Sequence, residues 1–500
     1  MRARLIPALA GAVASFALAG CAAPDESATA PPEPGQDGIR VMTFNIEWGG
    51  TGVSFDKVVE AIRVAEADVV GIQEAEGNLE RLAGELGWHF DLRNYVVSRF
   101  PLLEPPGADG RYVLVETAPG EVFALANLHL PSDPYGPDLV RDGAQLAEVL
   151  EVERSARLPA LQPWLDAVAP LVAAGMPVVV TGDFNAPPHT DWASAVVGSR
   201  PYLRFAVDWP VSRAMEAAGF RDAWRTVHPD VVARPGLTWW AARPPLPDYA
   251  PGPGDPEDRI DQVWIAGPVE ARDAIIVGET DGPGVALSVS PWPSDHRAVV
   301  ATLAIEAAAA PALVTTDRRV YAQGVPVRII GRAGGAGSLA VTIRNAASDE
   351  ELQTATLAGP SWQTSWAPPA PGHYAAIANA GGTELLREFW VLAADAEPEV
   401  TVAGAEAGPV VISWTNAPGH RNDYLALFEA GVPASADAIL AWAYVDARPE
   451  GSLPLNALGP AGWCLGSADG CDVLPGRYVV RLMKDDGYDV LAESPVFAIR

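Results

Sequence analysis

The feature that most constrains this chain is a recurring pattern between residues 38 and 306, in which short apolar strands run into carboxylate, amide or imidazole side chains. The clearest case is "VVVTGDFN", where β-branched residues typical of a buried strand lead directly to Asp183 and Asn185. Burying such groups costs free energy unless they are paired or bound to a cation. We therefore expect several strands to end at one edge of the fold, where these side chains are held for chemistry.

The same pattern recurs along the chain: Asn45 and Glu47 follow "VMTF", Glu74 follows "VVGIQ", Asn127 and His129 follow "FALA", Asp261 lies in "RIDQVWI", and Asp295 and His296 precede "RAVVATL". Each residue alone has a structural alternative, such as an Asx-turn at Asp183, an N-cap at Asp295 or a solvated rim position for Glu47. Together, these hard oxygen donors favour Mg²⁺, with Mn²⁺ or Ca²⁺ as alternatives, over zinc.

The order of apolar runs predicts an α/β domain over residues 38–306, with two packed β-sheets and helices outside them. Residues 139–174 have helical spacing, and the prolines at 159, 163 and 170 predict that this helix is broken into pieces. The segments 310–395 and 398–500 have frequent Gly/Pro turns and short strands, which predict two all-β immunoglobulin-like sandwiches. These modules are candidates for envelope or carbohydrate contact, or for a spacer.

The N-terminus is typical of a targeting segment. Residues 1–20 combine two arginines, an apolar run and small residues before Cys21, as in a bacterial lipoprotein signal peptide, and residues 21–37 read as a flexible linker. We expect Cys21 to be lipidated and to anchor the exported protein to a membrane of the bacterial cell envelope. The alternative is an ordinary secretory signal. Cys464 and Cys471 flank a short Gly-containing loop, and in an oxidising compartment we expect them to form a disulfide.

The charge of the chain limits its partners. A formal net charge of −29 argues against strong nonspecific binding to nucleic acid, which depends on Lys and Arg. Arg93, Arg99 and Arg141 are candidates for a local basic patch, so an extracellular nuclease acting on DNA or RNA remains an alternative.

Six motifs occur in a fixed order: "FNIEW", "GIQEAE", "NLHL", "TGDFNAP", "RIDQVWI" and "SDHRAV". This set resembles the endonuclease/exonuclease/phosphatase superfamily, and the resemblance covers about residues 38–306. It implies a four-layer α/β sandwich, with two sheets flanked by helices and a site at one edge of both sheets. It also implies phosphoester hydrolysis by metal-assisted attack of water.

The resemblance also implies a role for each motif residue. Glu74 corresponds to the main metal ligand, with Asn45 beside it, and Asp295 corresponds to a residue that binds or supports the metal. A divalent ion at this position offsets the charge of the phosphate and of the transition state.

The remaining motif residues correspond to the family's catalytic groups. Asp183 would orient or deprotonate the attacking water, and Asn185 would hold the phosphate or a second ligand position. His296 would contact the phosphate, with Asp261 fixing its tautomer. His129 matches the histidine near the leaving group, which is a candidate general acid.

We therefore expect an exported, lipid-anchored, divalent-metal-dependent phosphodiesterase or phosphatase whose phosphoester substrate is set by its loops. Family members often have substrate-reading loops and a tyrosine between the second motif and the hairpin, and Tyr95 is the only tyrosine in that stretch of this chain. His189 and Asp191 are candidates for lining the substrate side, although a helix start is an equal expectation for the stretch "HTDWAS". The alternative from another class is a non-catalytic surface binding protein, which the intact set of motif residues disfavours.

Overall fold

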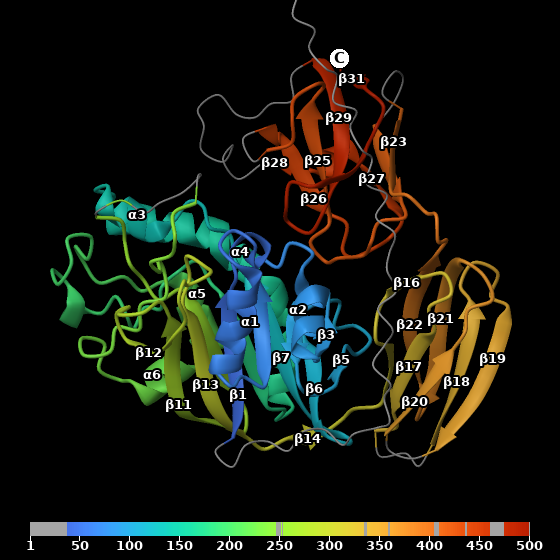
Figure 1. The fold of residues 1–500 in the computed structure, drawn as a ribbon, viewed down its shortest axis with the longest axis horizontal. Coiled ribbons are helices and arrows are strands. Elements are labelled where there is room, and N and C mark those ends of the chain that lie inside the picture. The colour runs from blue at the N-terminus through green and yellow to red at the C-terminus, as the bar shows by residue number, and fades with distance from the viewer. Residues whose placement is uncertain are drawn as a thin grey trace, which may run out of the picture.

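The computed structural model of the chain describes residues 38–246, 252, 254–334, 338–358, 361–404, 410–435, 438–460 and 475–499. Its N-terminal part contains two seven-stranded sheets (Figure 1). In spatial order, the first sheet consists of β12 (Val285–Ser288), β11 (Val269–Gly278), β13 (Ala298–Ile305), β1 (Ile39–Asn45), β2 (Val69–Gln73), β4 (Val96–Ser98) and β3 (His89–Asp91). The second consists of β5 (Leu102–Leu103), β6 (Val113–Ala118), β7 (Glu121–His129), β8 (Val178–Asp183), β10 (Asp261–Ala266) and β9 (Arg221–Asp222), with β14 (Ala308–Ala309) on β7.

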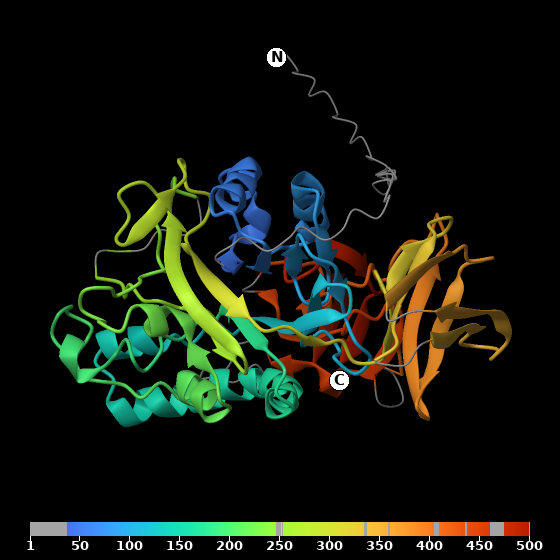
Figure 2. The same ribbon diagram turned by 90° about the horizontal axis from the view of Figure 1, so that it is seen from below.

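Helices cover the outer faces of both sheets, so the expected four layers are present, as Figure 2 shows from the edge. The helical elements are η1 (Trp48–Gly50), α1 (Phe55–Val64), α2 (Leu79–Leu86), α3 (Gly136–Arg141), α4 (Leu146–Ala173), η2 (Ser194–Val196), α5 (Pro210–Ala217) and α6 (Ala223–Val227). The residues of α1 and α2 share a core with β1 and β2, and those of α4 and α5 share one with β7 and β8. A third core fills the space between the sheets.

The expected break at the three prolines is wrong. The helix α4 runs continuously through Pro159, Pro163 and Pro170, and the chain breaks only between α3 and α4. Each proline removes one helical hydrogen bond, but burial of the inner face outweighs these losses. That face includes an ion pair between Arg157 and Glu153 at 2.7 Å, in which both side chains are fully buried.

Two further pairs of sheets follow this N-terminal part, each pair with a core of its own. The middle pair, or middle module, comprises β15 (Leu313–Thr316), β17 (Val327–Arg332) and β20 (Ser361–Trp366) against β16 (Val320–Ala322), β22 (Thr383–Leu392), β21 (Gly372–Ala380), β18 (Ser338–Asn345) and β19 (Glu351–Ala358). The C-terminal pair, or C-terminal module, comprises β23 (Glu399–Ala403), β24 (Val411–Thr415) and β27 (Gly451–Pro454) against β28 (Gly459–Pro460), β26 (Ala441–Tyr444), β25 (Tyr424–Glu429), β29 (Gly476–Met483), β30 (Val490–Glu493) and β31 (Phe497–Ile499), with η4 (Leu455–Ala457) after β27. Figure 1 shows the C-terminal pair at one end of the two N-terminal sheets and the middle pair beside them.

Buried ion pairs join the middle module to the N-terminal part. The Arg332 guanidinium binds both carboxylate oxygens of Glu116, and Arg387 Nη1 lies 2.7 Å from Glu104 Oε2. Glu104 also pairs with Arg93. Burial alone would raise the Glu104 pKa, but the charges of Arg387, Arg93 and Arg319 lower it to about 2.

Among the described helices, none has both the length and the apolar character needed to cross a membrane.

Candidate active site

The site begins where the core between the two sheets turns from apolar to polar. Along β1, side chains alternate between the two faces, so Ile39 and Val41 belong to the core between the sheets, whereas Met42 and Phe44 face the helices. The same alternation turns Asn45, at the end of β1, toward the second sheet, where its amide lies within hydrogen-bond distance of Asp183. The sequence pattern of polar strand ends therefore forms one cluster at one edge of both sheets.

Asn127 lies beneath the site, at the polar end of the core between the two sheets. Its Oδ1 accepts hydrogen bonds from Gln73 Nε2 at 2.6 Å and Thr181 Oγ1 at 3.0 Å, and its Nδ2 donates to the Ile72 carbonyl at 2.8 Å. A Cβ on Gly71 would lie 2.1 Å from Thr181 Oγ1, so only glycine permits this close approach of the sheets. Asn127 is thus a structural link between the sheets.

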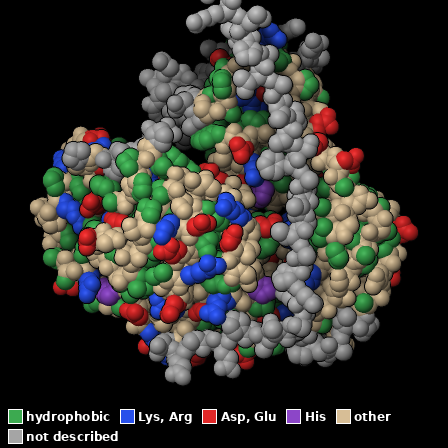
Figure 3. Space-filling view, viewed as in Figure 1, with side chains coloured by type: hydrophobic (Ala, Val, Ile, Leu, Met, Phe, Trp, Pro, Cys, Tyr) green, Lys and Arg blue, Asp and Glu red, His purple; other side chains and the backbone are tan. Residues whose placement is uncertain are grey.

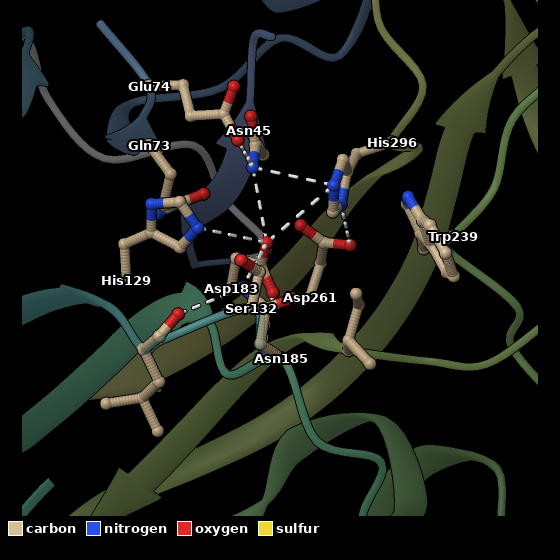
Figure 4. Close-up of polar contacts among 12 residues, drawn as sticks. Asn45, Gln73, Glu74, His129, Ser132, Asp183, Asn185, Trp239, Asp261 and His296 are labelled. Atoms are coloured by element: carbon tan, nitrogen blue, oxygen red, sulfur yellow. Dashed lines mark hydrogen bonds and ion pairs between the residues drawn. The ribbon is translucent and has the colours of Figure 1, made fainter. Parts of the chain in front are cut away.

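Strand register places three functional side chains in one row. Asp183 pairs with His129 across β7 and β8, and with Asp261 across β8 and β10. Asn45 and His296 reach the same point from β1 and from the loop before β13 (Figure 4).

The Asp183 carboxylate lies at the centre of this cluster (Figure 4). Its Oδ2 lies 3.2 Å from Asn45 Nδ2, 3.5 Å from His129 Nε2 and 3.7 Å from His296 Nε2. Its Oδ1 accepts a hydrogen bond of 2.8 Å from the Asn185 backbone N–H. Asp183 is 1% exposed, whereas the His129 side chain is 31% exposed, so the cluster is reached from the His129 side.

His296 and Asp261 form a buried pair. His296 Nδ1 lies 3.0 Å from Asp261 Oδ2, which leaves Nε2 directed at Asp183 and Asn45. Burial opposes the charged imidazolium, but the carboxylates of Asp261, Asp295 and Asp183 outweigh burial and raise the His296 pKa well above 6.5. The imidazolium form of His296, in which Nε2–H is a donor for an anionic ligand, is therefore favoured.

A second group of carboxylates lies beside this pair. Asp295 donates its backbone N–H to Glu47 Oε2 at 3.1 Å, and the other Glu47 oxygen pairs with Arg243. Burial, together with the charge of Asp295, raises the Glu47 pKa to about 7. Burial also raises the Asp295 pKa, which the charge of Glu74 raises further and that of His296 lowers.

Glu74 is oriented by its surroundings. Its Oε1 accepts from Asn45 Nδ2 at 2.9 Å, and its Oε2 accepts from the Trp48 backbone N–H at 3.1 Å. Its φ of 55° lies in the left-handed region, which is costly for Glu and typical of functional strand ends. Asp183, Asp261 and His296 form a second set of potential metal donors, with ligand atoms within 4.8 Å of one another.

The structure thus brings together all eight residues that the motifs predict: Asn45, Glu74, His129, Asp183, Asn185, Asp261, Asp295 and His296. Asn185 has its amide engaged, because Nδ2 donates to the Leu130 carbonyl at 2.9 Å. This side chain supports the loop that carries Asp183.

The solvated rim position considered for Glu47 is wrong, because Glu47 is 4% exposed and lies inside the site. The short helix η2 begins at Ser194, the last residue of the stretch "HTDWAS". In that stretch His189 bonds Ser212 Oγ at 2.9 Å, and Asp191 pairs with Arg259 and Arg225. Their place on the substrate side stays a prediction.

The sequence analysis missed two contributors. Arg243 neutralises Glu47, and Trp239 donates Nε1–H to Asp295 Oδ2 at 3.3 Å. Both lie in an irregular segment without an apolar strand beside them, so no pattern marked them.

The predicted lipidation site Cys21 and the predicted disulfide pair Cys464 and Cys471 lie outside the described residues.

The chain is similar to several known proteins. The chain is 29% identical over 294 residues to an uncharacterized protein from Caenorhabditis elegans, a match that covers 53% of this chain and 91% of that protein. Similar solved structures include an AP endonuclease from Archaeoglobus fulgidus (16% identity, TM-score 0.34, covering 54% of this chain and 99% of that one). Another is a mannosyl-6-phosphatase from Bacteroides thetaiotaomicron (13% identity, TM-score 0.30, covering 53% and 100%). Residues 42–296, half of the chain, match the sequence profile of one family, and the chain therefore belongs to the Endonuclease/Exonuclease/phosphatase family.

Proposed function

We propose that this chain is a divalent-metal-dependent phosphoester hydrolase, a phosphodiesterase or phosphatase, that is exported and anchored to the cell envelope through lipid on Cys21. The observation that carries the enzymatic part is the Asp183 carboxylate, which has Asn45, His129 and His296 around one oxygen, and Asp261 behind His296. Members of the family hydrolyse phosphoesters. This arrangement places a candidate base, a hydrogen-bond donor to the phosphate and a candidate acid around one point.

The donor set fits a hard divalent cation. The carboxylates of Glu47, Glu74 and Asp295 lie close together, and Arg243 pairs with Glu47. Burial, with a smaller contribution from repulsion between these carboxylates, raises the pKa values of Glu47 and Asp295, and a bound cation would oppose both effects. Glu74 and Asp295, with Asn45 beside them, would hold the ion, for which Mg²⁺ is the first candidate and Mn²⁺ or Ca²⁺ the alternatives. When bound, such an ion offsets phosphate charge and polarises the phosphoryl oxygen.

The chain's own residues perform the proton transfers. Asp183 orients a water molecule and accepts its proton, and Asn185 holds the loop that carries Asp183. The His296 imidazolium donates Nε2–H to a phosphate oxygen, held in that orientation by Asp261. His129, partly open to solvent, donates a proton to the leaving oxygen.

The nuclease alternative has less support. Arg93 pairs with Glu104, Arg99 with Asp68, and Arg141 with Asp138 and Asp255, so these three arginines do not form a free basic patch. On the face drawn in Figure 3, Lys and Arg side chains are interspersed with Asp and Glu. A small or lipid phosphoester is therefore a better candidate substrate than duplex DNA.

The test is hydrolysis of bis(4-nitrophenyl) phosphate and 4-nitrophenyl phosphate by the full mature chain, before and after chelation and with Mg²⁺, Mn²⁺ or Ca²⁺ restored. Turnover that is lost on chelation and regained with metal supports the proposal. Absence of turnover of both esters with all three metals would favour the binding-protein alternative.

The membrane anchor is tested separately. Cys21→Ser should release the protein from membranes or block its processing, and wild-type protein found wholly soluble outside the cell would refute anchoring.

A further inference from the structure

The C-terminal module reaches the candidate active site. A cleft at the edge of the sheets is lined on one side by Glu74, Glu76 and His129, and on the other by Arg421, Asn422 and Asp486. The second group follows the first by about three hundred residues in the sequence, and Figure 1 shows its strands at the same end of the catalytic sheets.

Specific hydrogen bonds fix this contact. The carboxylate of Asp485, which is 2% exposed, accepts from the Tyr95 hydroxyl and from the Gly77 backbone N–H. The backbone N–H of Asn422 donates to the same Tyr95 hydroxyl at 3.2 Å. The loop after Glu74 is therefore held directly against the C-terminal module.

Arg421 strengthens the contact without leaving its charge available to a ligand. Its Nη1 donates to the Arg93 carbonyl at 3.0 Å and to the Gly110 carbonyl at 2.9 Å. The guanidinium also lies 5.0 Å from the Trp164 ring centre and 5.4 Å from that of Tyr95. The cation is thus used to join the two parts of the chain.

The cleft carries two acidic side chains beside Glu74, Glu76 on one side and Asp486 on the other, which we call the acidic wall. The Asp486 side chain lines the cleft, and its Oδ1 accepts from the Tyr444 hydroxyl at 2.7 Å. Burial raises the Asp486 pKa to about 6, and the charge of His129 opposes this shift. Glu76 lines the same cleft, where burial, with the charges of Glu74, Asp486 and Asp489, raises its pKa to about 7 and the charge of Lys484 opposes this shift. Carboxylates accept hydrogen bonds from hydroxyl groups and repel anions.

We propose that Asp486 of the C-terminal module and Glu76 on the opposite side of the cleft are specificity-determining residues, which together select a phosphoester whose leaving group is uncharged and reject one that carries a second anionic group. The inference rests on the proposed function, because His129 marks the leaving-group side only if it is the proton donor. The carboxylates of the wall lie on that same side, and they can accept hydrogen bonds from a hydroxyl-bearing leaving group.

The experiment compares two probe substrates on the full mature chain with Mg²⁺: methyl 4-nitrophenyl phosphate, and the same ester with a carboxylate on the nitrophenyl ring. The measured quantity is the ratio of kcat/KM for the charged ester to kcat/KM for the neutral one, so that the intrinsic reactivities cancel between variants. We expect Asp486→Asn and Glu76→Gln each to raise this ratio by about threefold to thirtyfold at low salt, the range of one screened charge contact, and less at high salt. Asp349→Asn, an exposed Asp→Asn change in the middle module, is the matched control and should leave the ratio unchanged.

Two results separate the inference from the function on which it rests. If wild type hydrolyses the neutral ester and both variants keep the wild-type ratio, the wall does not select by charge, and only the inference fails. If wild type hydrolyses neither ester under any metal condition, the proposed function fails and the inference with it. Two variants from different segments guard against misfolding of either one, which circular dichroism would detect.

Discussion

Replacing Asp183 by Asn is the sharpest test of the site, because the replacement keeps the size of the side chain. The backbone N–H of Asn185 requires an acceptor at the Oδ1 position, 2.8 Å away, so the new amide must place its oxygen there and its NH₂ at the Oδ2 position. That NH₂ would then face Asn45 Nδ2 at 3.2 Å and the His296 imidazolium at 3.7 Å, both of which are donors. Neither orientation of the amide reproduces the wild-type contacts.

We expect kcat to fall by about 10²–10⁴-fold, the usual contribution of a positioned general base. At about 1.36 kcal/mol per tenfold change, this is a loss of about 3–5 kcal/mol of transition-state stabilisation. Stability should fall by about 1–3 kcal/mol, because the new buried NH₂ faces two donors, although Asn also removes a charge that repels buried Asp261. For a domain of this size, each 1 kcal/mol shifts Tm by about 2–4 °C.

The assay measures initial rates on bis(4-nitrophenyl) phosphate with saturating Mg²⁺, and Tm by circular dichroism on the same samples. Asp222→Asn is the matched control, since Asp222 is a buried carboxylate that pairs with Arg259 away from the site. It should lower Tm while each folded molecule keeps its activity. An Asp183→Asn protein within about threefold of the wild-type rate, or a rate loss that merely follows the unfolded fraction, would refute the reasoning.

Four further outcomes follow from other parts of the structure. Glu74→Gln should lose activity that higher Mg²⁺ or Mn²⁺ partly restores in a metal titration, because a weakened ligand lowers metal affinity first. Asp261→Asn should reduce kcat/KM less than His296→Ala does, because it only loosens the orientation of the imidazole; equal losses would contradict this order. Glu104→Gln should destabilise the protein by about 3–5 kcal/mol in denaturant melts, because it leaves buried arginines without their carboxylate; a change under about 1 kcal/mol would contradict it. Burial, with the nearby acidic charges, raises the Asp485 pKa from 3.8 to about 8, so the folded protein holds a proton that the unfolded chain releases, and stability should fall as pH rises from about 4 to 8. Asp485→Asn should remove this part of the pH dependence in melts at pH 5 and pH 8, and identical pH profiles for variant and wild type would contradict it.

The sequence was sufficient to predict the residues that combine strand periodicity with a polar strand end. Asp183, His129 and Asp261 could be found because each lies at one end of an apolar β-run, the last residue of β8, the last of β7 and the first of β10, and register then places them side by side. Arg243 and Trp239 could not, because they reach the site from an irregular segment whose course depends on tertiary packing. The continuity of α4 through its prolines also depends on packing, since burial against the sheet outweighs local propensity.

The contact between the C-terminal module and the candidate site could not be predicted from the sequence, for a related reason. Tyr95 stood out as the lone tyrosine of its stretch, but nothing local indicates that its hydroxyl binds Asp485 from a different β-module. Contacts between segments so far apart follow from how whole domains dock, and neither periodicity nor motif spacing encodes that docking.

The charge of the site explains how so acidic a chain can act on an anionic substrate. The site contains the carboxylates of Glu47, Glu74, Asp183, Asp261 and Asp295, and the cationic side chains of Arg243 and His296. Arg243 is paired with Glu47 and His296 with Asp261, so the remaining three carboxylates would repel a phosphate unless a cation bound first. Glu76 and Asp486 lie in the same cleft as Glu74 but are not among the proposed metal ligands. Under the proposed function, local placement of charge, rather than the net charge of −29, would therefore allow one phosphate to bind and disfavour a second anionic group beside it.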